Sequence, residues 1–294
     1  MAESDPEGGA VDPWSRPWIE ARLDALVRDN RFTIAVVFPV VGAVTLVASA
    51  EGWLPPLLAY NPFLVLVGVA VMRLPLVAGA APLVDRRAGL AVGALTAYAY
   101  GIELVGVETG WPYGPFEYAV DLGAMLFGRV PVGLPVFFLP LVLNAYLLVL
   151  LLLGGRAKNR PVRLVATLAT VLLVDLVLDP AAVAVGFWTY LPPGPYYGVP
   201  ASNYAGWVLS GAVAVVLFDV AFPYDELLAR VRSCPFMLDD LVSFVVLWGA
   251  INAVYGQWIP VALAGLLFAG LLATDRFDFR VLGGRGGRAW RSVR

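Results

Sequence analysis

Six acidic residues stand within or beside long apolar segments of the sequence. They are Glu51, Glu103, Glu108, Asp175, Asp179 and Asp219. A carboxylate in apolar surroundings is costly, so each of them is a candidate functional residue. Asp175 and Asp179 are spaced four apart and share one helix face, and Pro180 frees a backbone carbonyl and bends the helix directly after them. Because no basic residue lies near Glu103, Asp175 and Asp179, we predict that at least one of the three holds a proton.

The residue types that are missing limit the chemistry to these carboxylates. The 294 residues include no histidine, which is the usual ligand of haem, non-haem iron and catalytic zinc. The single lysine, Lys158, falls in a loop and offers no Schiff base, and the single cysteine, Cys234, excludes an internal disulfide. Carboxylate, tyrosine and water are left for acid–base work, so we expect no metal and no cofactor.

The composition places these carboxylates in a membrane. Hydrophobic residues make up 60% of the chain and charged residues 14%, against roughly half and about a quarter in a soluble domain. Segments long enough to cross about 30 Å of hydrocarbon are predicted at 32–50, 57–81, 88–107, 132–153, 162–186, 204–222, 241–255 and 257–274. All but two of the 20 basic residues fall in the termini and in alternate loops. We therefore predict a multi-pass protein of the cell membrane with both termini cytoplasmic.

The expected fold is an all-α integral membrane protein, a bundle of about eight transmembrane helices with two structured outer loops. Residues 1–31 are predicted to be a cytoplasmic tail with an interfacial amphipathic helix, 32–274 a polytopic catalytic domain, and 275–294 a basic cytoplasmic tail. On this topology Asp219 and Arg73 approach the inner ends of their helices and are expected to form an ion pair. Glu51, at a helix exit, is expected to be solvated.

The two outer loops are rich in aromatic residues, proline and glycine. They read ETGWPYGPFEYAVDLG at 108–123 and GFWTYLPPGPYYGVPASNYAGW at 186–207. Irregular backbone at membrane depth is tolerated only where it is buried in protein or lines a cavity, so we predict a rim over a pocket into which the carboxylates point. The alternative is an interfacial aromatic belt. The candidate binding residues are Trp111, Tyr113, Phe116, Tyr118, Trp188, Tyr197, Asn203 and Trp207.

Spaced motifs across this region carry a family resemblance. They are GVETGWPYGPFEY at 106–118, LG at 122–123, DLVLDP at 175–180, GFW at 186–188 and YYGVPASNYAGW at 196–207. In these motifs the chain resembles the CruF-type membrane carotenoid hydratases, a family that includes the bisanhydrobacterioruberin hydratases. The resemblance covers about a third of the chain, and WPYG departs from the Pro-Phe-Gly expected there.

The resemblance implies addition of water to the terminal double bonds of a long acyclic carotenoid within the bilayer, without a cofactor. Hydrating such an alkene needs a proton donor, a shielded tertiary cation and a base that activates water. Counting about 1.5 Å per helical residue from the helix ends places Asp175 and Asp179 deepest, Glu103 nearer the mouth and Glu108 at the rim. The aspartate pair is therefore expected to be the acid and Glu103 the base, with Asn203 positioning water and aromatic rings stabilising the cation.

Other functions stay open at this point. A carotenoid cyclase also begins by protonating the end of a polyene, and Asp175 and Asp179 mimic one magnesium motif of a prenyltransferase. A proton-coupled transporter would equally explain carboxylates near the midplane of the membrane. Expected partners are the carotenoid, membrane lipid and other membrane enzymes of the same pathway, with no nucleic acid.

Overall fold

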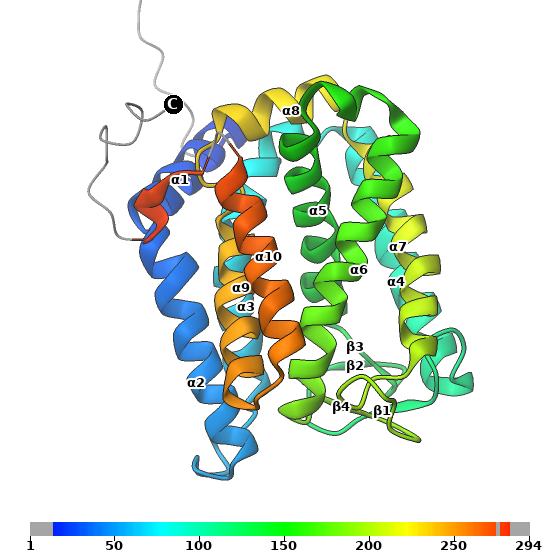
Figure 1. The fold of residues 1–294 in the computed structure, drawn as a ribbon. Helices are drawn as coiled ribbons and strands as arrows, with labels where there is room; N and C mark the ends of the chain where they lie inside the picture. The colour runs from blue at the N-terminus through cyan, green and yellow to red at the C-terminus, as the bar shows by residue number, and fades with distance from the viewer. Residues whose placement is uncertain (1–13, 275–276, 283–294) are drawn as a thin grey trace, which may run out of the picture.

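The chain folds as a bundle of helices with short strands at one end (Figure 1). The computed structural model describes residues 14–274 and 277–282. Six described helical segments are long and apolar enough to cross a membrane: Thr33–Ala50, Pro62–Leu83, Arg86–Thr109, Leu134–Lys158, Arg160–Ala184 and Ala201–Ala221. The protein is therefore an all-α membrane protein, as its sequence predicted.

The elements follow one another along the chain with short connections. The helices are α1 (Arg16–Asp29), α2 (Phe38–Ala50, entered through a π-helical turn, Thr33–Val37), α3 (Pro62–Ala80), α4 (Arg86–Thr109), α5 (Leu134–Leu153), α6 (Arg160–Ala184), α7 (Ala201–Ala221), α8 (Tyr224–Ser233), α9 (Asp239–Val254) and α10 (Trp258–Ala273). The strands are β1 (Phe116–Tyr118), β2 (Met125–Leu126), β3 (Val130–Pro131) and β4 (Trp188–Tyr190). Three-residue to five-residue 3₁₀ turns, Ala81–Leu83, Gly154–Lys158 and Phe279–Leu282, complete the described chain.

Side-chain caps fix where three of the long helices begin. The Asn61 side chain accepts hydrogen bonds from two backbone amides of the first turn of α3, at 3.1 Å each. Asp85 caps α4 through the Ala88 amide at 2.7 Å, and Asn159 caps α6. Each cap satisfies amides that have no partner inside the helix. These starts lie within five residues of the predicted limits.

The last helices differ from the prediction in detail. α9 and α10 have 16 residues each, fewer than the roughly 20 that a membrane span usually needs. The ten-residue helix α8 was not predicted, and it carries Asp225 and Glu226 in its first turn and Arg230 and Arg232 in its last. That order of charges suits the helix dipole. The predicted tail at 275–294 lies outside the described residues except for 277–282.

The two ends of the bundle are built differently. α1 and α8 lie at one end, and all four strands lie at the opposite end (Figure 1). There β1 pairs with β4 in antiparallel register, with Phe116 opposite Tyr190 and Tyr118 opposite Trp188. β2 and β3 form a separate hairpin. The two loops predicted from the sequence are therefore hydrogen-bonded to each other and cover one end of the bundle together.

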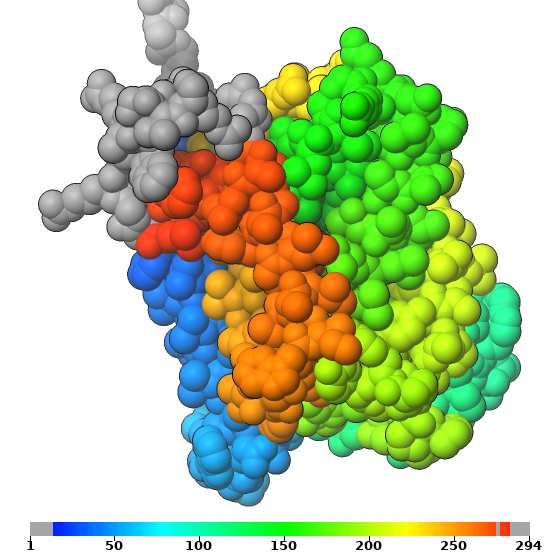
Figure 2. Space-filling model, viewed as in Figure 1, coloured from blue at the N-terminus to red at the C-terminus, as the bar shows by residue number. Residues whose placement is uncertain are grey.

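The buried hydrophobic residues form two clusters, and α5, the most buried of the six spanning segments, contributes side chains to both. Tyr146 and Leu147 at its middle are fully buried. α10 packs against α6 and α9 and covers the face between α2 and α6 (Figure 2). The bundle is thus closed around α5 by helices from both halves of the chain.

The predicted ion pair between Arg73 and Asp219 is wrong. Arg73 of α3 binds Asp240 of α9 at 2.6 Å, and Asp240 also accepts a hydrogen bond from Asn144 of α5 at 2.6 Å. Asp219 instead contacts Arg163 at 2.5 Å, because the end of α7 lies beside the start of α6. The sequence placed both residues at suitable depths but carried no information on which helices are neighbours.

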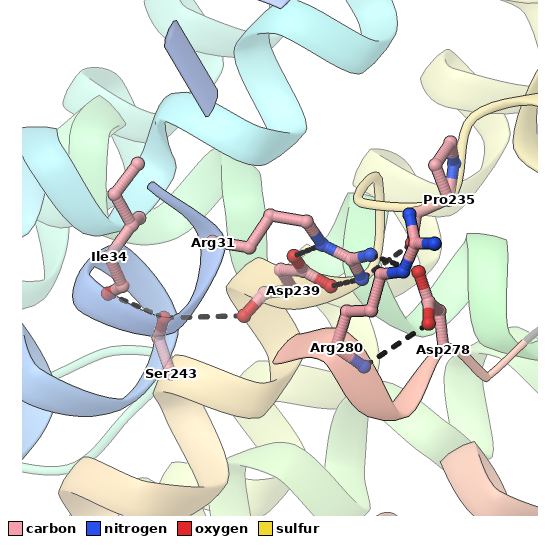
Figure 3. Close-up of polar contacts among 7 residues, drawn as sticks. All are labelled: Arg31, Ile34, Pro235, Asp239, Ser243, Asp278 and Arg280. Carbon is pink, nitrogen blue, oxygen red and sulfur yellow. Dashed lines mark hydrogen bonds and ion pairs between the residues drawn. The ribbon is translucent and has the colours of Figure 1, made fainter. Parts of the chain in front are cut away.

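Arg31 joins three segments at the end opposite the strands (Figure 3). Its guanidinium donates to both carboxylate oxygens of Asp239, at 2.6 and 2.8 Å, and to the Pro235 carbonyl at 2.8 Å. It also binds Asp278, beyond the end of α10. Arg31 and Asp239 are each about 5% exposed, so this fork-like contact lies in the interior. It ties the chain before α2 to the start of α9 and to the segment that follows α10.

Substituting Arg31 tests this clamp. Arg31→Met keeps the aliphatic stem but leaves Asp239 buried without its cation, a loss that typically costs roughly 3–5 kcal/mol. We expect a clearly lower thermal midpoint in detergent, followed by circular dichroism. Arg28→Met is the matched control, because Arg28 is exposed and its pair with Asp24 is worth at most about 1 kcal/mol. Equal midpoints for the two variants would mean that the cluster does not hold the bundle together.

Candidate active site

A cavity of about 660 Å³ lies at the strand end of the bundle. This volume is within the range of roughly 300–1,000 Å³ that is usual for small-molecule sites. Its walls come from α3, α4, α5, α6, α7 and α9 and from the strands and loops, and they are mainly apolar. The predicted site residues that line it are Glu103, Tyr113, Phe116, Tyr118, Asp179, Trp188, Asn203 and Trp207. Most of the polar residues that line the cavity were therefore predicted from the sequence.

The two aspartates of α6 are joined by one amide. Nδ2 of Asn203, on α7, donates to Oδ2 of Asp175 at 3.2 Å and also to Oδ2 of Asp179. Asp179 lines the cavity, whereas Asp175 is buried behind it and leaves its Oδ1 without a partner in the described part of the chain. The four-residue spacing thus places both carboxylates on the face of α6 that packs against α7. There the Asn203 amide bonds to both of them.

Pro180 contributes to this geometry in the way its position predicts. Proline has no amide hydrogen, so the carbonyl of Leu176, one turn earlier, lacks its usual helical partner. The hydroxyl of Tyr196 donates to that carbonyl at 3.2 Å. Gln257 donates to the carbonyl of Pro180 itself at 3.2 Å. The carbonyl that Pro180 leaves without its helical partner is therefore satisfied by a side chain of the second loop, and Gln257 adds a contact to α6 from the start of α10.

Tyr190 is a site residue that the sequence reasoning missed. Its hydroxyl donates to Oδ2 of Asp179 at 3.2 Å, and its ring lines the cavity. Burial raises the pKa of the Tyr190 hydroxyl, so this group stays protonated and acts as a donor. The sequence did contain a signal for Tyr190. Side chains two residues apart in a strand share a face, and Tyr190 lies two residues after Trp188, which was selected.

Glu103 of α4 meets the first loop. The Tyr118 hydroxyl donates to Oε1 of Glu103, and both residues line the cavity. Burial and then the charge of Glu103 raise the pKa of Tyr118, which again makes the phenol a donor. Because β1 and β4 are paired, Tyr118 and Tyr190 bring one phenol to each of the two carboxylates that line the cavity.

Tyr113 is wedged between two glycines. A Cβ on Gly206 of α7 would lie 2.4 Å from Cδ1 of the Tyr113 ring, and one on Gly106 of α4 would lie 3.0 Å from Cδ2. The Tyr113 hydroxyl is 2.7 Å from Oγ of Ser210, one turn further along α7. Only residues without a side chain allow the ring to insert between α4 and α7, where it forms part of the cavity wall.

Besides Asp175, which is buried behind the cavity, three predicted residues do not line it. Glu108 is exposed and pairs with Arg129 at 3.1 Å. Trp111 is 59% exposed, and the Tyr197 hydroxyl accepts a 3.5 Å hydrogen bond from the Ile259 amide. The structure adds Trp248 of α9 and Phe187, both buried lining residues that the sequence reasoning did not select.

In the described part of the chain, no cluster of three or more His, Cys, Asp or Glu residues could hold a metal ion.

Comparison with known proteins agrees with the earlier resemblance and extends it. The profile of the family described as carotenoid biosynthesis protein matches residues 60–271. The chain belongs to the carotenoid biosynthesis protein family. A relative from Haloarcula japonica, named bisanhydrobacterioruberin hydratase, is 70% identical over 272 residues, which are 92% of this chain and 92% of the relative. No solved structure matches the chain.

The family match is longer than the motifs suggested. It includes all the residues that line the cavity, from Pro62 to Trp248, whereas the recognised motifs ended at Trp207. The chain is therefore similar to this family of carotenoid biosynthesis proteins in α3 and α9 as well as in the two loops.

The Tyr113 wedge gives a direct test of the packing. Gly206→Ala places a methyl group against the Tyr113 ring, and we expect a loss of roughly 1–3 kcal/mol from overpacking. Gly93→Ala is the control, since a Cβ at Gly93 of α4 meets nothing within 4 Å and alanine favours a helix. Thermal midpoints in detergent should fall for Gly206→Ala and stay level or rise for Gly93→Ala. A Gly206→Ala protein as stable as the parent would contradict the wedge.

Proposed function

We propose that the protein hydrates the terminal carbon–carbon double bonds of an acyclic carotenoid. Its 70% identical relative from Haloarcula japonica is named bisanhydrobacterioruberin hydratase. The geometric observation that carries the proposal is the pair of carboxylates, Asp179 and Glu103, that line one otherwise apolar cavity. An apolar cavity suits a hydrocarbon substrate, and two carboxylates supply the acid and the base that the addition of water needs. The proposal includes no metal and no cofactor.

Asp179 is the proton donor in this proposal. Asn203 and Tyr190 both donate to its Oδ2, which leaves Oδ1 to carry the proton into the cavity. Asp175 supports it from behind, because two carboxylates that share one amide donor are not both stable as anions in apolar surroundings. Asn203 thus holds the pair, in place of the role of positioning water that its sequence position suggested.

The proton moves from Asp179 to the less substituted carbon of the terminal double bond, and the π bond breaks to leave a tertiary cation on the other carbon. The ring faces of Trp188, Trp207 and Phe116 lie in the cavity wall and stabilise this cation. Glu103 accepts a proton from a water molecule as its oxygen bonds to the cation, which gives the tertiary alcohol. Transfer of that proton from Glu103 back to Asp179 through water restores the starting state, so the reaction consumes only alkene and water.

The proposed topology has eight spans, with α9 and α10 as the last two and both termini in the cytoplasm of a cell-membrane protein. Its support is the position of the basic residues, since Arg86 begins α4, Arg160 begins α6, and Arg230 and Arg232 end α8. The starts of α4 and α6 and the end of α8 lie at the α1 end of the bundle, which is the cytoplasmic end on the positive-inside rule. Residues 32–274 then form one catalytic unit in the membrane, and the strand end faces outward.

A hydration assay tests the function. The purified protein in detergent with a chelator should convert an acyclic, dehydrated carotenoid into its alcohol, with the new oxygen coming from labelled water. A cyclised product without labelled oxygen would identify a cyclase, and dependence on a metal, nicotinamide or dioxygen would refute the proposed chemistry.

Isotope exchange in heavy water separates the two carboxylates. General acid and base groups each contribute roughly 10²- to 10⁴-fold in rate, so Asp179→Asn should lose hydration and also deuterium entry into the carotenoid. Glu103→Gln should lose hydration, but deuterium should still enter unhydrated substrate when the cation returns its proton. Glu108→Gln is the control outside the cavity and should stay close to the parent. Normal hydration by a folded Asp179→Asn protein would exclude Asp179 as the acid.

Cysteine labelling tests the topology. In a Cys234→Ser background, thiols introduced at Pro115 and Pro195 should react with an impermeant reagent from outside the cell, and thiols at Lys158 and Arg230 only after lysis. Labelling of positions 115 and 158 from the same side would overturn the arrangement.

A further inference from the structure

The exposed part of the cavity lining has a uniform chemical character. Four lining residues are exposed, Phe63 and Leu66 on α3 and Ala124 and Val132 beside the β2–β3 hairpin, and all four are apolar. Phe63, Leu66 and Val132 are 70%, 41% and 49% exposed. The mouth of the cavity is therefore formed by the first two turns of α3 and by this hairpin.

The polar lining groups lie away from the mouth. Asp179, Tyr190 and Asn203 are buried, and Glu103 and Tyr118 are half-buried. Buried apolar lining residues come from α4, α5, α6 and α9 and from both loops. A ligand that enters thus meets apolar side chains first and carboxylates last.

One side of the mouth belongs to a candidate membrane-spanning segment. Phe63 and Leu66 belong to the span Pro62–Leu83, and Leu66 is about 6 Å along the helix from its first residue. α3 packs on α2, α5 and α9, whereas α4 packs on α5 and α7, so the two helices flank the cavity from different sides of α5. Because exposed side chains of a spanning helix contact lipid, we expect the α3 side of the opening to border the hydrocarbon beside the bundle.

Contacts within the hairpin hold this opening in shape. The Tyr100 hydroxyl of α4 donates to the Val132 carbonyl at 2.6 Å, and the Val132 amide donates to the Ala124 carbonyl at 2.8 Å. On the other side of the hairpin, a Cβ on Gly123 would lie 3.3 Å from Pro62. The backbone on both sides of the mouth is thus fixed by neighbouring elements.

We infer that this mouth is a lateral portal, through which one end of the polyene enters from the hydrocarbon of the bilayer while the remainder of the molecule stays in lipid. The identity of the ligand rests on the proposed function. A polyene taken up from water would first have to expose its whole apolar surface, whereas entry from lipid avoids that unfavourable transfer. The apolar mouth and the buried carboxylates fit a substrate whose reacting group is at its tip.

Cross-linking from the mouth tests the portal without requiring turnover. A diazirine amino acid is placed at position 66, 132 or 105 of the full chain, which is reconstituted in phospholipid vesicles with the acyclic carotenoid of the hydration assay. Val105 is the control, because it is an exposed residue of α4 that does not line the cavity. Illumination should give coloured protein adducts at 66 and 132 and only background at 105.

Narrowing the mouth gives an independent kinetic readout. Leu66→Trp and Val132→Trp should lower kcat/KM at least roughly tenfold, whereas Val105→Trp should stay within about twofold of the parent. Adducts at 105 as strong as those at 66 and 132, or unchanged kcat/KM in both mouth variants while the parent hydrates the carotenoid, would overturn the portal. Adducts confined to 66 and 132 without any hydration by the parent would support the portal and refute the proposed reaction.

Discussion

The amide of Asn203 is the contact on which the rest of the site depends. Two carboxylates one turn apart in an apolar bundle repel each other and have lost their water, so they persist only with donors and with a shared proton. Asn203 reaches both of them from α7, and Tyr190 adds a second donor to Asp179. This arrangement requires α6 and α7 to pack side by side and the second loop to fold back over their ends.

The loops at the strand end are part of this construction. β1 and β4 hydrogen-bond to each other, so the phenols of Tyr118 and Tyr190 are placed by one small sheet. Tyr113 enters between α4 and α7 where Gly106 and Gly206 leave room for its ring. Irregular backbone is acceptable at this depth because it is bonded to itself and covers a cavity. The positions of both carboxylates relative to the cavity thus depend on loops that are distant in sequence.

Most of the fold could be predicted because apolar segments in lipid must form helices, whose limits follow from composition. The acidic residues of the site stood out for the same reason, since Asp179 and Glu103 interrupt such segments. What could not be predicted depends on which helices are neighbours: the pairing of Arg73 with Asp240 and the contribution of Trp248. Glu108 was selected as an acidic residue beside an apolar segment, and Trp111 as an aromatic residue of the first outer loop. Both lie at or just beyond the end of α4, where a side chain can be exposed to solvent, as these two are.

The cluster around Arg31 has a consequence for the order of biosynthesis. Arg31 and Asp278 are separated by 247 residues, and Asp239 lies between them. At about 5–20 residues per second, Arg31 is added to the chain roughly 10–42 s before Asp239, which is 208 residues later, and roughly 12–50 s before Asp278. Until Asp239 has been made, the arginine before the first span has neither of its carboxylate partners. The chain is therefore joined at this end only when translation is almost complete, and the bundle reaches its final packing after the last helix has been inserted.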